Sequence, residues 1–173
     1  SCFTLSGFVI DKDGKTLPIT QVKKIEFIGD SITEGYVAPS DKAENIANNS
    51  YLNSYALKAG RKLNAEFGWS FNTVAFGGIG LVRVNNGDPL TMGERYFLLS
   101  EYIKSTDGTT RESALAAVGA YDYNYVPDYI VINLGTNDGS LSSQDFFENY
   151  VDFIKDLKEA YPNVVIFCMT PFN

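Results

Sequence analysis

A serine stands directly after a short apolar run in the stretch KIEFIGDSITEGY, residues 24–36. This serine, Ser31, has the type and the place of a nucleophile that attacks an acyl carbon from the end of a buried strand. A serine hydroxyl is a poor nucleophile until a neighbouring base takes its proton, and the usual base is histidine. The 173 residues contain no histidine. The sequence therefore indicates a nucleophile without showing its base.

Two other loops combine glycine with small polar residues, and each follows another apolar run. One is FGGIG, with Gly78 and Gly80, and the other is GTND, with Asn137. Because ligands of open α/β sheets bind beyond the carboxyl ends of the strands, we expect the three loops to meet in one cleft. Acyl transfer needs donors for the oxyanion of its tetrahedral intermediate. The Ser31 N–H, a glycine N–H and the Asn137 amide could supply them.

Each of these residues also has a plainer structural interpretation. Ser31 could only cap the helix that follows it, and Asn137 could close an Asx-turn. The glycines could simply permit positive φ angles, and the GIG triplet lacks the third glycine of a dinucleotide-binding loop. We expect Asp30 to brace its turn by accepting backbone N–H bonds, and Asp138 to hold its own loop.

The composition argues against several classes of partner. The chain has 14 basic and 21 acidic residues, a net charge of −7 and no cluster of lysine and arginine. We therefore expect neither nucleic acid nor an anionic membrane as a partner, and neutral substrates fit better. No apolar run approaches the roughly 18 residues of a membrane-spanning helix. The first residues lack the basic region and cleavage site of a signal peptide, which predicts a cytosolic protein or one whose leader has been removed.

Apolar runs and helical periodicity alternate along the chain and predict an α/β protein. We expect strands at 24–29, 69–76, 129–134 and 163–170, and helices at 49–67, 92–103, 112–120 and 142–162. Ser142 is expected to cap the last helix, and Cys168 to be a small buried residue of the last strand. Near-continuous apolar strands indicate a parallel, flavodoxin-like sheet covered on both faces, in which the first and third strands are neighbours.

The three loops together resemble the blocks of the SGNH, or GDSL, hydrolases. IGDSITEGY resembles the first block, which makes Ser31 the nucleophile, and LGTND resembles the third, which makes Asn137 the oxyanion asparagine. The family's oxyanion glycine falls at Gly78, with Gly80 as the alternative. Further stretches resemble the family 2 carbohydrate esterases, namely GFVIDKDGKTLP, NSYLNSYALKAGRKLNAEF, GGIGLVR and MGERY.

The resemblance implies a three-layer SGNH hydrolase domain at residues 21–173, and a β segment at 1–20 that connects it to a preceding β-sandwich domain. It implies a lipase-like serine esterase that removes acetyl groups from xylan and related polysaccharides, acts on acetylated polysaccharide or a small ester, and uses no cofactor or metal. Secretion is implied as well, since polysaccharide lies outside the cell. Tyr36, Trp69, Arg83 and the loops at 36–51 and 87–96 are candidates for sugar contact or for packing.

The departure from the family is the missing histidine. The family's last block, a D-x-x-H stretch late in the domain, supplies the base, whereas these residues end at CMTPFN. We therefore expect the fifth strand, the last helix and the general base to lie outside this chain, and the chain alone to be inactive. The alternative is a non-catalytic remnant or carbohydrate-binding module that keeps the cleft. In either case the stretch 163–170 could associate through an exposed sheet edge.

Overall fold

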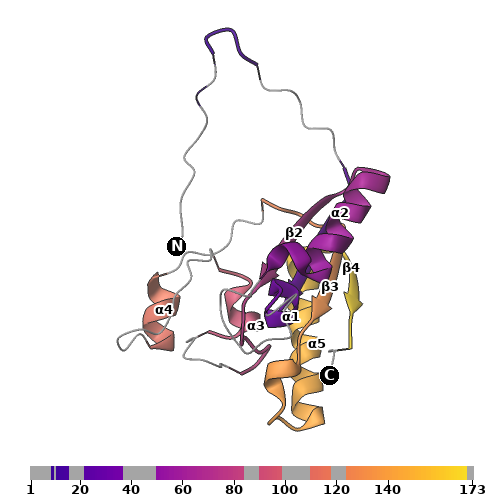
Figure 1. Ribbon diagram of the computed structural model, residues 1–173. Helices are drawn as coiled ribbons and strands as arrows, with labels where there is room; N and C mark the ends of the chain where they lie inside the picture. Colours follow the sequence, from indigo (N-terminus) through magenta and orange to yellow (C-terminus); the bar gives the residue numbers. More distant parts are fainter. Residues whose placement is uncertain are drawn as a thin grey trace.

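The computed structural model describes residues 9, 11–15, 22–36, 50–83, 90–98, 110–117 and 124–170. Four parallel strands form one sheet, and β1 and β3 are neighbours, as the sequence predicts (Figure 1). The order across the sheet is β2-β1-β3-β4, which is the order of a flavodoxin-like fold as far as the described strands extend. The strands are β1 (Lys24–Gly29), β2 (Ser70–Ala75), β3 (Tyr129–Asn133) and β4 (Val165–Cys168).

One face of the sheet is covered by helix α2, Tyr55–Phe67. The Ser54 side chain caps this helix by accepting the Leu57 N–H at 3.2 Å, and Gly68 ends it with a φ of 69°. The predicted helix is therefore confirmed from Tyr55 onward, while the preceding residues Tyr51–Asn53 form the short 3-10 helix η2. Because strand side chains alternate between faces, every second residue of β1 packs against α2. The buried members of this layer are Ile25, Phe27 and Ala56.

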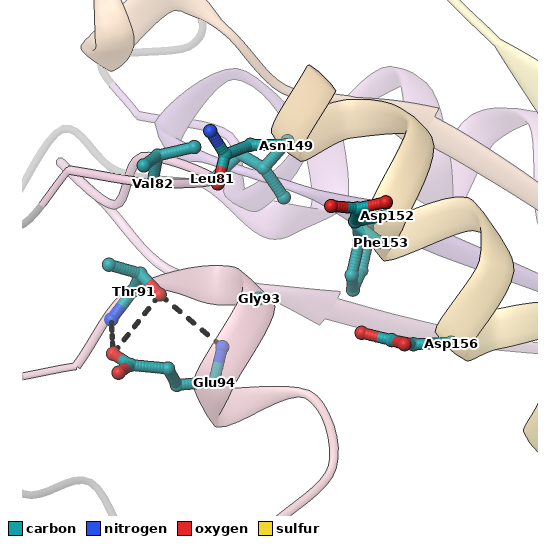
Figure 2. A pocket seen from close by; sticks show the side chains of 9 residues that line it. All are labelled: Leu81, Val82, Thr91, Gly93, Glu94, Asn149, Asp152, Phe153 and Asp156. Carbon is teal, nitrogen blue, oxygen red and sulfur yellow. Dashed lines mark hydrogen bonds between the residues drawn. The ribbon is translucent and has the colours of Figure 1, made fainter. Parts of the chain in front are cut away.

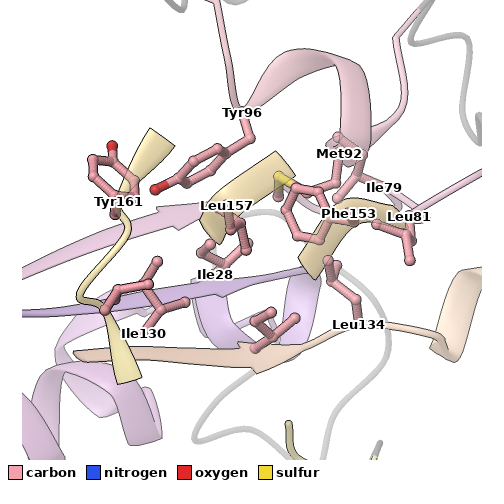
Figure 3. Close-up of a cluster of buried hydrophobic side chains, with 12 residues drawn as sticks. Ile28, Ile79, Leu81, Met92, Tyr96, Ile130, Leu134, Phe153, Leu157 and Tyr161 are labelled. Carbon is pink, nitrogen blue, oxygen red and sulfur yellow. The ribbon is translucent and has the colours of Figure 1, made fainter. Parts of the chain in front are cut away.

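The opposite face carries the larger core, beneath helix α5, Ser143–Ala160. The predicted cap is confirmed, since the Ser142 hydroxyl accepts the Asp145 N–H at 3.0 Å. Phe153 and Leu157 are the buried residues of α5. Figure 3 shows them packed between the strands and the segment that bears Met92 and Tyr96. Two cores on opposite faces of one sheet confirm the three-layer α/β arrangement.

The long insertion after β2 contains two described helices. Helix α3 spans Met92–Arg95, where Thr91 and Glu94 form a capping box, and helix α4 spans Arg111–Ala117. Of the predicted helices at 92–103 and 112–120, residues 99–103 and 118–120 lie outside the described part. None of the described helices is both long and apolar enough to cross a membrane.

Of the β segment predicted at residues 1–20, the structure describes only residue 9 and the turn at 11–15. The Gly14 N–H donates to the Asp11 carbonyl at 2.8 Å, which confirms a turn in DKDGK. Residues 1–8, 10 and 16–21 lie outside the described part. The β segment at 1–20 and the domain boundary at 21 therefore stay predictions.

Strand β4 is exposed on the face away from α5. Val165 is 47% exposed and Phe167 is 52% exposed, and the Phe167 ring stacks on Tyr129 with 6.4 Å between centroids. The prediction that Cys168 is buried is wrong, because its thiol is free and exposed. The reason is that β4 pairs with β3 alone among the described strands, so its outer edge has no described neighbour.

A carboxyl group lies inside the larger core, on the middle of β1. Glu26 is 3% exposed, and its two oxygens accept hydrogen bonds from the Asn72 amide and the Tyr96 hydroxyl. These bonds connect β1 to β2 and to the residue that ends α3. Burial raises the pKa of Glu26 above its ordinary value of 4.5, against the opposing effect of the two bonds.

We predict that this carboxyl makes the free energy of unfolding depend on pH. Because the pKa of Glu26 is higher in the folded state than in the unfolded state, the native state holds the proton more tightly. The contribution of Glu26 to the free energy of unfolding is therefore complete below about pH 4.5 and falls as the pH rises. Glu26→Gln should therefore gain stability relative to the unsubstituted protein as the pH is raised from 4 to 8, as measured by urea denaturation. Glu159→Gln, on the exposed face of α5, is the control and should show no such trend. A constant difference for Glu26→Gln would contradict the prediction.

We also predict that the outer edge of β4 is covered in solution, by a second copy, another chain or a separate fragment. Unpaired backbone groups beside exposed apolar side chains favour association. Phe167→Glu should lower the mass found by light scattering after size exclusion, because a charge at an edge strand opposes pairing. Phe147→Glu is the matched control, since Phe147 is 62% exposed near the start of α5 and is not part of the sheet. A monodisperse monomer with no second polypeptide would contradict the prediction.

Candidate active site

Ser31 is the first residue of a one-turn helix that begins where β1 ends. Helix α1 spans Ser31–Glu34, and its N-cap is Asp30, whose Oδ1 accepts the Ile32 N–H at 2.9 Å. The interpretation of Asp30 as a brace is confirmed, and the alternative that Ser31 is the cap is wrong. Asp30 is fully buried, and burial raises its pKa. Gly35 ends the helix with a φ of 92° and donates to the Ser31 carbonyl.

The end of β1 must be a glycine because the helix turns back against it. A Cβ on Gly29 would overlap the Thr33 hydroxyl and lie 3.0 Å from the Asn133 carbonyl oxygen. The Thr33 hydroxyl in turn bonds the Tyr55 hydroxyl at 3.0 Å. This contact joins α1 to α2, so the position of Ser31 is fixed by the sheet on one side and by α2 on the other.

The second loop begins with a tight turn at residues 76–79. The Ile79 N–H donates to the Phe76 carbonyl at 3.3 Å, and Gly78 has a φ of 79° at the third position, as a type II turn requires. The Phe76 N–H donates to the Gly29 carbonyl at 3.3 Å, which places the turn beside the start of α1. The Arg95 guanidinium lies 4.7 Å from the centre of the Phe76 ring and holds the turn from the opposite direction.

The structure distinguishes between the two candidate oxyanion glycines. The Gly80 N–H donates to the Arg83 carbonyl at 3.1 Å, so it serves the loop itself. A Cβ on Gly80 would lie 2.6 Å from Asp138 Oδ1, so close packing explains this glycine. The Gly78 N–H, by contrast, donates to no backbone carbonyl of the described residues. The two glycines thus differ in the bonds that their N–H groups make, and Gly78 as the oxyanion donor stays a prediction.

The third loop holds Asn137 within the short 3-10 helix η3, Thr136–Asp138, directly beyond β3. Asn137 Nδ2 donates to the Ile79 carbonyl at 2.8 Å, so its amide reaches across to the second loop. The Asn137 side chain is thus positioned beside the glycine turn.

Asp138 joins the same two loops more strongly. Its carboxylate accepts three successive backbone N–H groups, from Leu81 at 2.9 Å, Val82 at 3.0 Å and Arg83 at 3.1 Å. The expectation that Asp138 holds its own loop is therefore wrong, since these N–H groups belong to the loop after β2. The side chain is 3% exposed, so these bonds are formed away from water.

The three predicted loops therefore lie together at the carboxyl edge of the sheet. β1 lies between β2 and β3, so Ser31 follows the central strand of the three. The Ser31 Cβ lies 4.0 Å from the point where a Cβ on Gly77 would sit. A serine, a glycine turn and an asparagine amide therefore lie at one edge, and these are groups of the kinds that acyl transfer requires.

The candidate sugar contacts differ in where they lie. Trp69 precedes β2, at the opposite edge of the sheet from Ser31, and stacks on Tyr129 with 4.9 Å between centroids. Trp69 is therefore a packing residue rather than a sugar contact at this cleft. Tyr36 follows α1 and is 41% exposed, and Arg83 is exposed beside the bonds to Asp138. The loops at 37–49 and 84–89 lie outside the described part.

Two hollows border the loops. The first, of about 360 Å³, is lined by Glu34, Tyr51, Phe71, Asn72, Thr73 and Ala75. The second, of about 280 Å³, lies between the loop at 81–82, α3 and α5, and contains the carboxyl groups of Glu94, Asp152 and Asp156 (Figure 2). Glu94 is engaged in the capping box there, through its bonds with Thr91. The described residues hold no group of three side chains placed to bind a metal ion.

Comparison with known proteins agrees with this geometry. The model of the GDSL-like Lipase/Acylhydrolase family matches residues 27–173. The chain belongs to this family, and its parallel α/β sheet with loops at the carboxyl edge is the corresponding fold.

Its relatives include carbohydrate esterases. The chain is 38% identical over 156 residues to cellulase/esterase CelE of Acetivibrio thermocellus, covering 84% of this chain and 17% of CelE. It is 31% identical to an acetylxylan esterase / glucomannan deacetylase of Cellvibrio japonicus, covering 87% of this chain and 43% of that protein. Among solved structures, it resembles a family two carbohydrate esterase from Clostridium thermocellum in complex with cellohexaose, with a TM-score of 0.65 and 34% identity. That match covers 90% of this chain and 46% of the other.

We predict that Asp138→Asn disrupts the second loop. An amide in this place turns its NH₂ group toward at least one of the three N–H donors, which leaves a buried donor unpaired. The free energy of unfolding should fall by about 2–4 kcal/mol, as measured by urea denaturation. Asp156→Asn, at an exposed position of α5, makes the same chemical change and should alter it by less than about 0.5 kcal/mol. Equal effects of the two substitutions would refute the role given to Asp138.

Proposed function

We propose that the chain carries the nucleophile and the oxyanion hole of a serine esterase that hydrolyses O-acetyl esters on a polysaccharide such as xylan. The Ser31 hydroxyl attacks the acetyl carbonyl carbon, while the Ser31 N–H, the Gly78 N–H and the Asn137 amide bind the oxyanion. The sugar hydroxyl leaves as the acetyl-serine ester forms, and water then releases acetate and restores Ser31. The proposed reaction uses no cofactor and no metal.

The observation that carries this proposal is the meeting of the three loops. Asn137 binds the carbonyl of Ile79, one residue beyond Gly78, and the turn that holds Gly78 bonds the end of β1 just before Ser31. Preorganised donors of this kind contribute roughly 10²–10³ each to the rate of other serine hydrolases. A binding module would have no need of a glycine N–H held beside a serine.

The general base is proposed to be a histidine outside these residues. The sequence contains no histidine, and the two carboxylates that adjoin Ser31 and Asn137 in sequence are engaged. Asp30 caps α1, and Asp138 accepts three backbone N–H groups. The chain spans less than half the length of each relative and solved structure compared above, which leaves room in them for a further segment. The histidine would first take the Ser31 proton and then give it to the departing sugar oxygen, which leaves as the free hydroxyl.

The proposed substrate and location follow from the relatives. One of them is named as an acetylxylan esterase and glucomannan deacetylase, and one solved structure is a complex with cellohexaose. We propose an acetylated polysaccharide or a small acetyl ester as the substrate, and action outside the cell, where such polymers occur. Besides the substrate, we propose a partner that covers the outer edge of β4. Nucleic acid and membranes are not proposed as partners.

The second candidate is a carbohydrate-binding module that keeps the cleft without the reaction. The absence of histidine from the 173 residues favours it. The two candidates differ in what happens when the histidine segment is supplied, because a remnant would bind acetylated xylan without releasing acetate.

We predict that the 173 residues alone do not release acetate from an acetyl ester at an enzymatic rate. Loss of the histidine costs serine hydrolases about 10⁶ in kcat. A longer polypeptide that continues through the histidine block should be active, and Ser31→Ala should lower its kcat by about the same factor. Ser113→Ala, at an exposed position of α4, is the control and should keep full activity.

Two outcomes would count against this mechanism. If the 173 residues turn over at ordinary esterase rates, the base is a carboxylate within the chain. If the longer polypeptide binds acetylated xylan and releases no acetate, the binding module is the correct function.

A further inference from the structure

One residue of the first block has no part in the mechanism above. Glu34 ends helix α1, three residues after Ser31, so the two side chains extend from the same side of one helical turn. Its carboxyl group is half-buried rather than fully solvated, and burial raises its pKa. A carboxyl group held this close to a nucleophile requires a physical reason.

The reason lies in the glycine turn opposite. Glu34 Oε2 lies 2.8 Å from the point where a Cβ on Gly77 would sit, and the Ser31 Cβ lies 4.0 Å from the same point. The Gly77 N–H faces the carboxylate and acts against the rise in its pKa. The two glycines of the turn are therefore required for different reasons. Gly77 leaves room for Glu34, and Gly78 takes the positive φ of the turn.

We infer that Glu34 is a positioning residue for the proposed esterase reaction, whose carboxylate holds the Gly77 N–H and thereby aims the following Gly78 N–H at the oxyanion. This inference rests on the proposed function. The Gly77 N–H belongs to the Phe76–Gly77 peptide unit, and the Gly78 N–H belongs to the next unit along the chain. Fixing the first unit leaves only the two backbone torsions of Gly77 to set the direction of the Gly78 N–H. Hydrogen bonds to an ionised acceptor are about twice as strong as neutral ones, which suits this task.

The surroundings of Glu34 agree with a positioning role. The hollow beside it is lined by five other residues, of which Tyr51 alone can ionise, and the Tyr51 hydroxyl bonds Thr73 at 2.6 Å. On its own helix the nearest carboxyl is Asp30, which caps α1 and is bonded to Ile32. The contact of Glu34 that the structure shows is thus with the turn.

Kinetics of the longer polypeptide test the inference. Glu34→Ala removes the acceptor and should lower kcat by about 10–100-fold with little change in KM. This decrease is smaller than the effect of removing an oxyanion donor, because the Gly78 N–H is still present but less well aimed. Glu34→Gln keeps an acceptor oxygen of the same reach and should restore kcat to within about fivefold of the unsubstituted protein. Glu66→Ala, at an exposed position of α2, is the control and should change neither constant.

Nuclear magnetic resonance of the 173 residues gives a second test that needs no catalysis. The amide resonance of Gly77 should shift with pH as Glu34 ionises, and this titration should vanish in Glu34→Gln while the rest of the spectrum is unchanged. A Gly77 amide that does not titrate overturns the inference, even if Glu34→Ala fails to fold.

The outcomes separate the inference from the proposed function. If Ser31→Ala abolishes activity while Glu34→Ala keeps full kcat, Glu34 has no positioning role and the esterase function stands. If the unsubstituted longer polypeptide is inactive, the proposed function fails, and the Gly77 titration still decides whether Glu34 holds the turn.

Discussion

The carboxylate of Asp138 is the constraint on which the arrangement of the site depends. It accepts three consecutive N–H groups of the loop after β2, and the neighbouring Asn137 amide binds the carbonyl of Ile79 in the same loop. A carboxylate buried among backbone donors stabilises one arrangement, because any other would leave a charge or several N–H groups without partners. The glycine turn therefore takes its position from the strand on the far side of β1.

The other contacts of the glycine turn reach it from different elements. The Phe76 N–H bonds the end of β1, the Arg95 guanidinium lies over the Phe76 ring, and Glu34 lies against Gly77. Contacts from several directions are what a preorganised set of donors requires, because its effect depends on not having to reorganise during the reaction. Packing fixes the loop as well, because Ile79 and Leu81 are buried in the larger core.

Much of this architecture could be predicted from the sequence, because apolar runs and helical periodicity are strong over β1, β3, α2 and α5. Block resemblance also placed the three loops at one edge, and the cap at Ser142 followed from its type and spacing. The contacts between loops could not be predicted. Asp138 was expected to serve its own loop, since nothing in a local pattern shows that its partners lie more than 50 residues earlier, at Leu81 for example.

The exposure of Cys168 illustrates a different limit. An apolar stretch indicates a buried strand, and whether a neighbour covers it depends on residues elsewhere in the fold. The start of α3 is set by the capping box at Thr91 and Glu94, whose T-x-x-E spacing is visible in the sequence. The type of each element could thus be predicted better than its surroundings.

The pairing of β1 with both β2 and β3 has a consequence for the order of folding. Ser31 adjoins partners that are distant in sequence, since Gly29 pairs with Ala75 on one side and with Asn133 on the other. Contacts between distant segments form slowly, because the entropy of closing a long loop must be overcome first. A chain emerging from the ribosome has its serine long before it has the amide of Asn137. The cleft is therefore completed only when the third strand has joined the sheet.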